Sequence, residues 1–84
     1  MTMQRFYFTL SRTDQWYAIM RECRAWFGKD WRCQPKVRRK LSTGAFGRRP
    51  CQVWFDVPDE RFASWVAVKL AVEVVSESRM QANK

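Results

Sequence analysis

The fold is decided by residues 51–57, whose sequence is CQVWFDV. Every second residue from Cys51 to Val57 is apolar, and Gln52, Trp54 and Asp56 lie between them. A period of two in a run rich in β-branched and aromatic residues is typical of a half-buried strand. One face of this strand therefore belongs to a core, and Trp54 lies on the other face.

The residues before this strand predict its hairpin partner. Residues 31–41 also have a period of two, with basic and polar side chains on one face and mostly apolar ones on the other. Because Pro35 has no N–H for a ladder, this strand should lie at a sheet edge or begin after the proline. Residues 42–50, with two glycines and a proline, are expected to form a flexible connection. If the two strands fold back at the start of this connection, Cys33 lies opposite Cys51.

A strand and a helix are predicted nearer the N-terminus. Residues 4–10 alternate, with Tyr7 on the face opposite the two phenylalanines. Ser11 or Thr13 is expected to cap a helix whose apolar residues recur at three- and four-residue spacing. Gly28 is expected to end this helix.

Residues 62–79 carry two patterns at once. Every second residue from Val66 to Val74 is apolar, as in a strand, whereas the alanines, Lys69 and Glu73 favour a helix. The segment is also longer than a usual strand, so we expect a helix over residues 62–79. Its apolar arc is wider than one sheet face requires, and the first helix or a second copy of the chain should cover the rest.

The order strand, helix, strand, strand, helix predicts one small α+β domain spanning residues 1–84. A right-handed crossover after the first strand makes the first two strands parallel, and the third can insert between them. The expected fold is a three-stranded sheet with two helices on one face and an open opposite face. This is a βαββα split βαβ arrangement, a truncated ferredoxin-like layout.

The composition narrows the function. The chain has 16 Lys and Arg, 8 Asp and Glu and no His, which gives a net charge of +8. Without His there are no His general bases, no Cys–His or Ser–His nucleophile pairs and no His-ligated zinc, so we expect no enzyme, no metal and no cofactor. The positive charge favours nucleic acid, a membrane surface or an acidic protein as the partner.

The compartment is predicted from what the chain lacks. No run approaches the roughly 20 apolar residues of a membrane-spanning helix, and the first residues lack signal-peptide features. The three cysteines, Cys23, Cys33 and Cys51, form no paired motif. We therefore expect a cytoplasmic protein with reduced thiols and no membrane partner, and a Cys33–Cys51 disulfide is the alternative.

The positive charge is concentrated in residues 31–55, which hold seven basic residues and no acidic one. Such a cluster favours a polyanion, and the alternative is a solvated basic edge strand that prevents aggregation. The candidate phosphate-binding residues are Arg32, Lys36, Arg38, Arg39, Lys40, Arg48 and Arg49.

Two aromatic residues complete the candidate site. Tyr7 and Trp54 are expected on neighbouring strands, on the open face with Arg32 and its basic neighbours, where they could stack on unpaired bases. The alternative is an aromatic cross-strand pair or a patch buried by a second subunit. The layout resembles the RNA recognition motif, whose stacking aromatics also lie on its first and third strands. Residues 49–55 do not carry that family's glycine- and aromatic-rich signature.

These features predict a small non-enzymatic module that binds nucleic acid, single-stranded RNA or DNA rather than duplex. The alternative is an accessory protein, of the kind found in phages and plasmids, that binds a host protein through its basic face. A small ribonuclease toxin is a third hypothesis. A homodimer through the C-terminal helix is also expected. The acidic residues Asp56, Asp59 and Glu60 are interpreted as a strand end and a helix cap rather than as a metal site.

Overall fold

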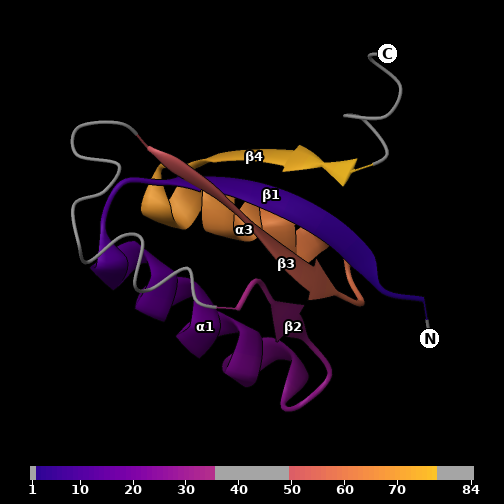
Figure 1. The fold of residues 1–84 in the computed structure, drawn as a ribbon. Helices are drawn as coiled ribbons and strands as arrows, with labels where there is room; N and C mark the ends of the chain where they lie inside the picture. The colour runs from indigo at the N-terminus through magenta and orange to yellow at the C-terminus, as the bar shows by residue number, and fades with distance from the viewer. Residues whose placement is uncertain (1, 36–49, 78–84) are drawn as a thin grey trace.

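Among the residues that the structure describes, two helices pack on one face of a four-stranded antiparallel sheet (Figure 1). The computed structural model describes residues 2–35 and 50–77. The strands are β1 (Gln4–Leu10), β2 (Arg32–Cys33), β3 (Cys51–Val57) and β4 (Glu73–Ser76). The helices are α1 (Thr13–Phe27) and α3 (Arg61–Leu70).

The strand order in the sheet is β2-β3-β1-β4. Strand β3 pairs antiparallel with both β1 and β2, so β1 and β2 are parallel to each other, as expected for a crossover through α1. The prediction of three strands is wrong, because β4 pairs antiparallel with the other edge of β1. Strand β1 is therefore central, and every residue of it from Phe6 to Thr9 has a partner on both sides.

The helix predicted over residues 62–79 is correct only in its first half. Helix α3 ends at Leu70, Ala71 has a left-handed φ of 53°, and the chain turns into β4. In β4, Val74 lies opposite Phe8 and Val75 lies opposite Tyr7. The free edge of β1 offers hydrogen bonds to this valine-rich segment, and this pairing overrides the helical tendency of the sequence.

Replacing Ala71 with glycine is expected to stabilise the protein by about 0.5–1 kcal/mol. A left-handed conformation costs an L-residue about 1–2 kcal/mol, and the greater freedom of glycine in the unfolded chain offsets about 0.4–1 kcal/mol of the gain. Thermal denaturation followed by circular dichroism measures the change. The matched control is Ala67→Gly inside α3, which should destabilise the protein by about 1 kcal/mol. Equal destabilisation by both variants would contradict the left-handed turn.

The ends of α1 are fixed by Gln15 and Gly28. The N-cap residue is Arg12, and Oε1 of Gln15 accepts hydrogen bonds from the backbone N–H groups of Ser11 (2.8 Å) and Arg12 (3.1 Å). The expected caps, Ser11 and Thr13, are therefore wrong: Arg12 occupies the N-cap position, and the Gln15 side chain binds the backbone N–H groups just before the helix. The expected stop at Gly28 is confirmed, with a φ of 65°.

The core lies between the helices and one face of the sheet. Phe55 is fully buried at its centre, where its ring contacts Phe8 (5.4 Å between centroids), Trp16 (5.1 Å) and Trp31 (6.4 Å). Trp26, an aromatic residue of α1, is 39% exposed. The buried residues are Phe6, Phe8, Leu10, Trp16, Ile19, Cys23, Cys51, Val53, Phe55, Val57, Phe62, Ala63, Val66 and Val72.

The hairpin of β2 and β3 has a different register from the one predicted. Cys33 lies opposite Phe55 rather than Cys51, and no disulfide joins Cys23, Cys33 and Cys51 to one another. Strand β2 lies at the sheet edge and ends before Pro35, as a proline at that position requires. The remainder of the predicted strand and most of the connection that follows it, residues 36–49, lie outside the described residues.

Candidate functional site

The sheet face that points away from the helices carries three rows of side chains, and we call these nine residues the open face. Alternation along each strand and the pairing register define the rows. The first row is Arg5, Asp56 and Arg32, the second is Tyr7, Trp54 and Val75, and the third is Thr9, Gln52 and Glu73.

The first row is built around a bidentate ion pair between β1 and β3. Nε of Arg5 donates to Oδ1 of Asp56 (2.7 Å), and Nη2 of Arg5 donates to Oδ2 (3.0 Å). The hydrogen bonds to Asp56 raise the pKa of Arg5 above its usual range, so its guanidinium stays charged. Arg32 lies directly opposite Asp56 on the other side and is exposed. Asp56 therefore lies between two arginines.

The second row places two aromatic rings side by side. Tyr7 and Trp54 are directly opposite each other on β1 and β3, and both are half-buried. The guanidinium carbon of Arg5 lies 3.8 Å from the centroid of the Trp54 ring, a cation–π contact. Because Asp56 and Trp54 both hold Arg5, its guanidinium has one orientation over the aromatic row. This arrangement offers aromatic surface and oriented N–H donors to a planar or anionic ligand.

The structure brings three of the nine predicted site residues together. Tyr7, Trp54 and Arg32 lie on the open face, as the alternation predicts. The other six lie outside the described residues: Lys36, Arg38, Arg39, Lys40, Arg48 and Arg49.

Sequence reasoning missed the ion pair of the open face, Arg5 and Asp56. The signal was present, because alternation along residues 4–10 and 51–57 puts Arg5 with Tyr7 and Asp56 with Trp54. A count of charge by sequence segment does not show this pair, because the two residues are 51 positions apart and fall in different segments. The two arginines of the open face are balanced by Asp56 and Glu73.

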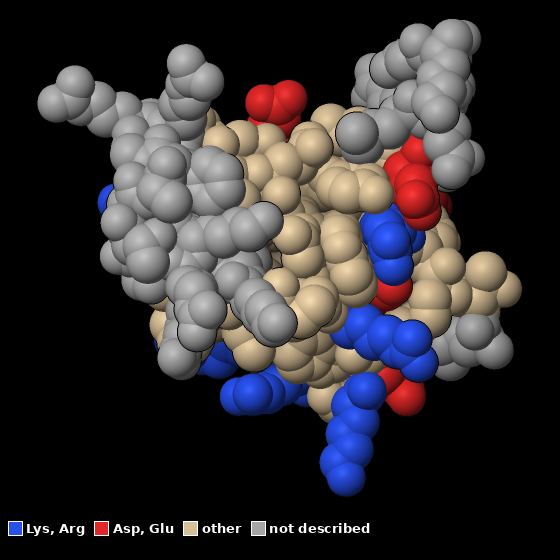
Figure 2. Space-filling model, in the orientation of Figure 1, with Lys and Arg blue, Asp and Glu red and all other residues tan. Residues whose placement is uncertain are grey.

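The space-filling view agrees with this mixed charge. In Figure 1, β3 passes in front of α3, so the same orientation looks onto the sheet. Figure 2 shows an uncharged centre, with Lys or Arg beside Asp or Glu along the right side of the view. Further Lys and Arg lie along the lower edge, where Figure 1 has α1 and the turn after it. The described part of the sheet face is therefore not uniformly basic.

The three acidic residues of segment 56–60 do not converge. Asp56 binds Arg5, whereas Asp59 accepts a hydrogen bond from the backbone N–H of Arg61 (2.9 Å) at the start of α3. Asp59 also pairs with the Arg61 guanidinium (2.7 Å), and these hydrogen bonds lower the pKa of Asp59. Asp59 therefore binds a backbone N–H group in the first turn of α3, as a helix cap does, although the N-cap position itself is Glu60. Within residues 2–35 and 50–77, no cluster of three possible metal ligands occurs.

A second group of aromatic residues lies on the helical side. Trp26 of α1 and Trp65 of α3 are 39% and 47% exposed, and their ring centroids are 6.3 Å apart. Glu22 accepts hydrogen bonds from Nε1 of Trp65 (3.4 Å) and from Lys69. The hydrogen bond from Lys69 lowers the pKa of Glu22. Helix α1 thus covers part of the apolar arc of α3. Of the two expected covers, the first helix or a second copy of the chain, this is the first.

The three thiols are expected to react at different rates. Cys23 is buried and Cys33 is half-buried, and burial raises the pKa of both thiols. Cys51 is also buried. In the folded protein at mildly alkaline pH, iodoacetamide should label Cys33 first, and Cys23 and Cys51 should be labelled only on unfolding. Peptide mass spectrometry measures this order, and a Cys33→Ser control should lose the first label. Labelling of Cys23 as fast as Cys33 would contradict the packing of α1.

No protein-family model matches the chain, and neither a curated protein nor a solved structure matches it. No helix in the described part of the chain is long and apolar enough to cross a membrane. What the protein does is therefore inferred from its own residues.

Proposed function

We propose that this protein is a small non-enzymatic module that binds single-stranded nucleic acid through its open face. In this proposal Tyr7 and Trp54 stack on unpaired bases, and the basic residues of segment 31–55 neutralise phosphates. The observation that carries the proposal is the direct pairing of Tyr7 with Trp54 on a sheet face that no described helix covers.

The aromatic pair favours single strands over duplex. Bases inside a duplex are stacked on each other, whereas unpaired bases can stack on exposed aromatic side chains. Each such stack contributes about 1–3 kcal/mol. Tyr7 and Trp54 are neighbours across one strand pair and are both partly exposed, so successive bases of one strand can reach both rings.

Arg5 adds an oriented cation to the aromatic row. Its bonds to Asp56 engage Nε and Nη2, and its guanidinium lies over the Trp54 ring. A base or a phosphate that approaches Trp54 meets a guanidinium already held in one orientation, which lowers the entropic cost of binding.

The phosphate contacts in this proposal come from the basic residues around β2 and β3. Arg32 belongs to the first row of the open face, and the segment that carries the other six basic residues begins after β2 and ends before β3. Those six are Lys36, Arg38, Arg39, Lys40, Arg48 and Arg49. Such contacts release counterions, so they make the affinity dependent on salt.

We also propose that the fold is a full ferredoxin-like arrangement rather than a truncated one. The support is the element order βαββαβ with the sheet order β2-β3-β1-β4. The fourth strand increases the likeness to the RNA recognition motif, in which the stacking aromatics lie on the first and third strands.

Fluorescence anisotropy with labelled oligonucleotides tests the proposed function. Single strands of about 12 nucleotides, as RNA and as DNA, are compared with a duplex of the same length. We expect single strands to bind more tightly, and about five phosphate contacts would lower the affinity about a hundredfold between about 50 and about 200 mM salt. Absence of binding at the lower salt would overturn the function, and tighter binding of the duplex would overturn the stacking mechanism.

A second candidate function is an accessory protein that binds a host protein. The observation in its favour is the balance of two arginines by Asp56 and Glu73 on the open face, which suits a partner surface that carries charges of both signs. Affinity capture from cell extract, with and without nuclease, separates the two functions. Capture of one protein that resists nuclease would favour this candidate.

A further inference from the structure

The side chain of Arg5 is held in place on the open face by three neighbours. Nε and Nη2 of Arg5 donate to the two carboxylate oxygens of Asp56, at 2.7 and 3.0 Å, and the guanidinium carbon lies 3.8 Å from the centroid of the Trp54 ring. Asp56 and, to a smaller extent, a side-chain interaction with Tyr7 raise the pKa of Arg5. The guanidinium is therefore charged and has a fixed orientation beside both aromatic rings.

The pairing with Asp56 uses one edge of the guanidinium and leaves another. A guanidinium is planar and carries five N–H donors, so two of its edges can each bind a pair of acceptors. Asp56 binds the edge formed by Nε and Nη2, and the edge formed by Nη1 and Nη2 is not bound to this carboxylate. The Arg5 side chain is 33% exposed, so a ligand on the open face can reach this second edge.

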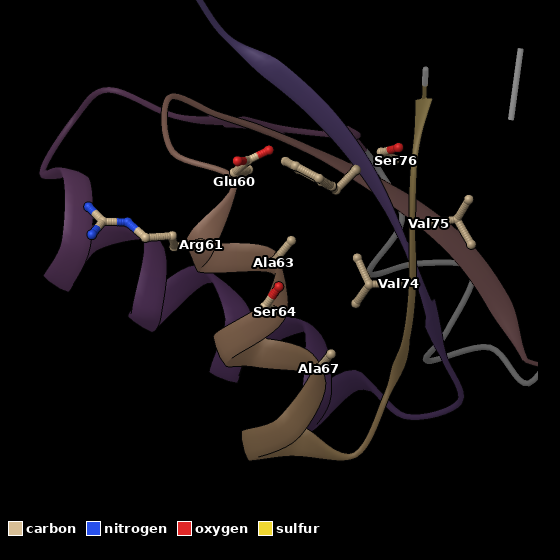
Figure 3. Close-up of a pocket in the computed structure, with 9 residues that line it drawn as sticks. Glu60, Arg61, Ala63, Ser64, Ala67, Val74, Val75 and Ser76 are labelled. Carbon is tan, nitrogen blue, oxygen red and sulfur yellow. The ribbon is translucent and has the colours of Figure 1, made fainter. Parts of the chain in front are cut away.

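The ion pair between Arg61 and Asp59 shows what is particular to Arg5. Nε and Nη2 of Arg61 also donate to the Asp59 carboxylate, at 3.1 and 2.7 Å. Arg61 borders the cavity between α3 and β4, and its side chain extends away from β4 (Figure 3). Among the described residues, Arg5 is the only arginine with a cation–π contact. The Arg5 pair thus combines an oriented donor edge with an aromatic surface beside it.

A base that binds this edge through two hydrogen bonds must present two neighbouring acceptors. Guanine has O6 and N7 side by side. Cytosine has O2 and N3 side by side, on the edge that a single strand leaves unpaired. Adenine and uracil have no two acceptors side by side, so they can form only one such hydrogen bond with the same edge.

We propose that Arg5 makes the open face selective for guanine or cytosine, through hydrogen bonds from Nη1 and Nη2 to two neighbouring acceptors of one base. This selectivity rests on the proposed function, to which it adds the choice of base. The guanidinium contacts the Trp54 ring as a stacked base would, so it lies in the layer that stacked bases occupy. Arg5 and a base stacked beside it on Tyr7 can therefore meet edge to edge.

A phosphate also offers two neighbouring acceptors, but the position of Arg5 favours a base. Arg5 belongs to the central strand β1 and contacts the aromatic row, where the proposed function places the bases. Arg32 belongs to the edge strand β2 and forms no ion pair with the described residues. Arg32 is thus the better phosphate contact of the two, and Arg5 the better base contact.

Two pairs of labelled single strands of about 12 nucleotides test the selectivity by fluorescence anisotropy at one low salt concentration. The first pair compares a strand of cytidines with a strand of uridines. The second compares alternating thymidine and deoxyguanosine with the same strand carrying 7-deazaguanine, which has a C–H group in place of N7. We expect the strand with two neighbouring acceptors to bind about tenfold more tightly in at least one pair. The pair that shows the preference identifies the base.

Arg5→Lys tests whether Arg5 is the source of the preference. Lysine keeps the charge but has one nitrogen in place of the planar edge, so the preference should fall below about twofold. The matched control is Arg32→Lys, which makes the same change in the same row of the open face and should retain the preference. Both variants keep the net charge and should keep the salt dependence of the unaltered protein. Circular dichroism verifies that both variants fold.

The outcomes separate the selectivity from the proposed function. Equal affinities within both pairs, with binding retained, would overturn the selectivity and leave the proposed function standing. A preference that persists in Arg5→Lys, or an equal loss of affinity for all four strands in this variant, would also overturn it, and the equal loss would make Arg5 a phosphate contact. Absence of binding to every strand would overturn the proposed function and the selectivity together.

Discussion

Replacing both Tyr7 and Trp54 with alanine is expected to weaken binding of a single-stranded oligonucleotide about a thousandfold. Each stacked base contributes about 1–3 kcal/mol, and the two losses together come to about 4 kcal/mol. The two rings are directly opposite each other across β1 and β3, so both are available to one bound strand. Anisotropy titration at fixed low salt measures the loss.

The salt dependence separates stacking from charge in this experiment. The double variant keeps every basic residue, so the slope of log affinity against log salt should stay as in the unaltered protein. The matched controls are Tyr17→Ala and Trp65→Ala, which remove exposed aromatic rings from α1 and α3 and should leave the affinity unchanged. If the double variant binds as tightly as the unaltered protein, the rings do not stack on bases and only electrostatic attraction is left.

Phe55→Ala is expected to lower the free energy of unfolding by about 3–5 kcal/mol, a large part of the stability of a domain of this size. Phe55 is fully buried on β3, the strand that pairs with both β1 and β2. Its ring contacts Phe8, Trp16 and Trp31, so truncation leaves a cavity where the sheet meets α1. Urea denaturation followed by circular dichroism measures the loss.

A conservative and a distant substitution serve as controls for Phe55→Ala. Phe55→Leu retains most of the buried volume and should cost less than about 2 kcal/mol. Val75→Ala removes a half-buried side chain from the open face and should cost less than about 1 kcal/mol. A cost below 1 kcal/mol for Phe55→Ala itself would mean that β3 does not lie at the centre of the core.

The two central strands could be predicted from the sequence because each has one buried face. In residues 4–10 and 51–57 the apolar residues alternate, and burial follows that alternation. The same alternation predicted that Tyr7 and Trp54 lie on the open face. If the pairing of either strand slipped by one residue, all of its apolar side chains would move to the exposed face. The alternation therefore determines on which face of the sheet each side chain lies.

The C-terminal part could not be predicted because one apolar pattern continues through two elements. The alternation from Val66 to Val74 runs through the end of α3, the left-handed turn at Ala71 and into β4. Only the free edge of β1 decides where the helix ends and the strand begins, and a local pattern carries no information about that edge.

The register of β2 and the Arg5–Asp56 pair were missed for a related reason. Strand β2 has only two residues and a long connection to β3, so no short turn fixes its register. Arg5 and Asp56 meet only because β1 pairs with β3. Contacts between distant segments require the sheet order and the register, and the sequence predicted only the order β2-β3-β1, without β4 and without the register.

The central claim, that the open face binds single-stranded nucleic acid, is tested most directly by the indole N–H signals of the five tryptophans in a two-dimensional NMR spectrum. Trp54 lies on the open face, whereas Trp26 and Trp65 are exposed on the helical side and serve as internal controls. On titration with a single-stranded oligonucleotide, the Trp54 signal is predicted to shift or broaden first, and the signals of Trp26 and Trp65 to stay in place. Movement of Trp26 and Trp65 with an unchanged Trp54 signal would contradict the claim.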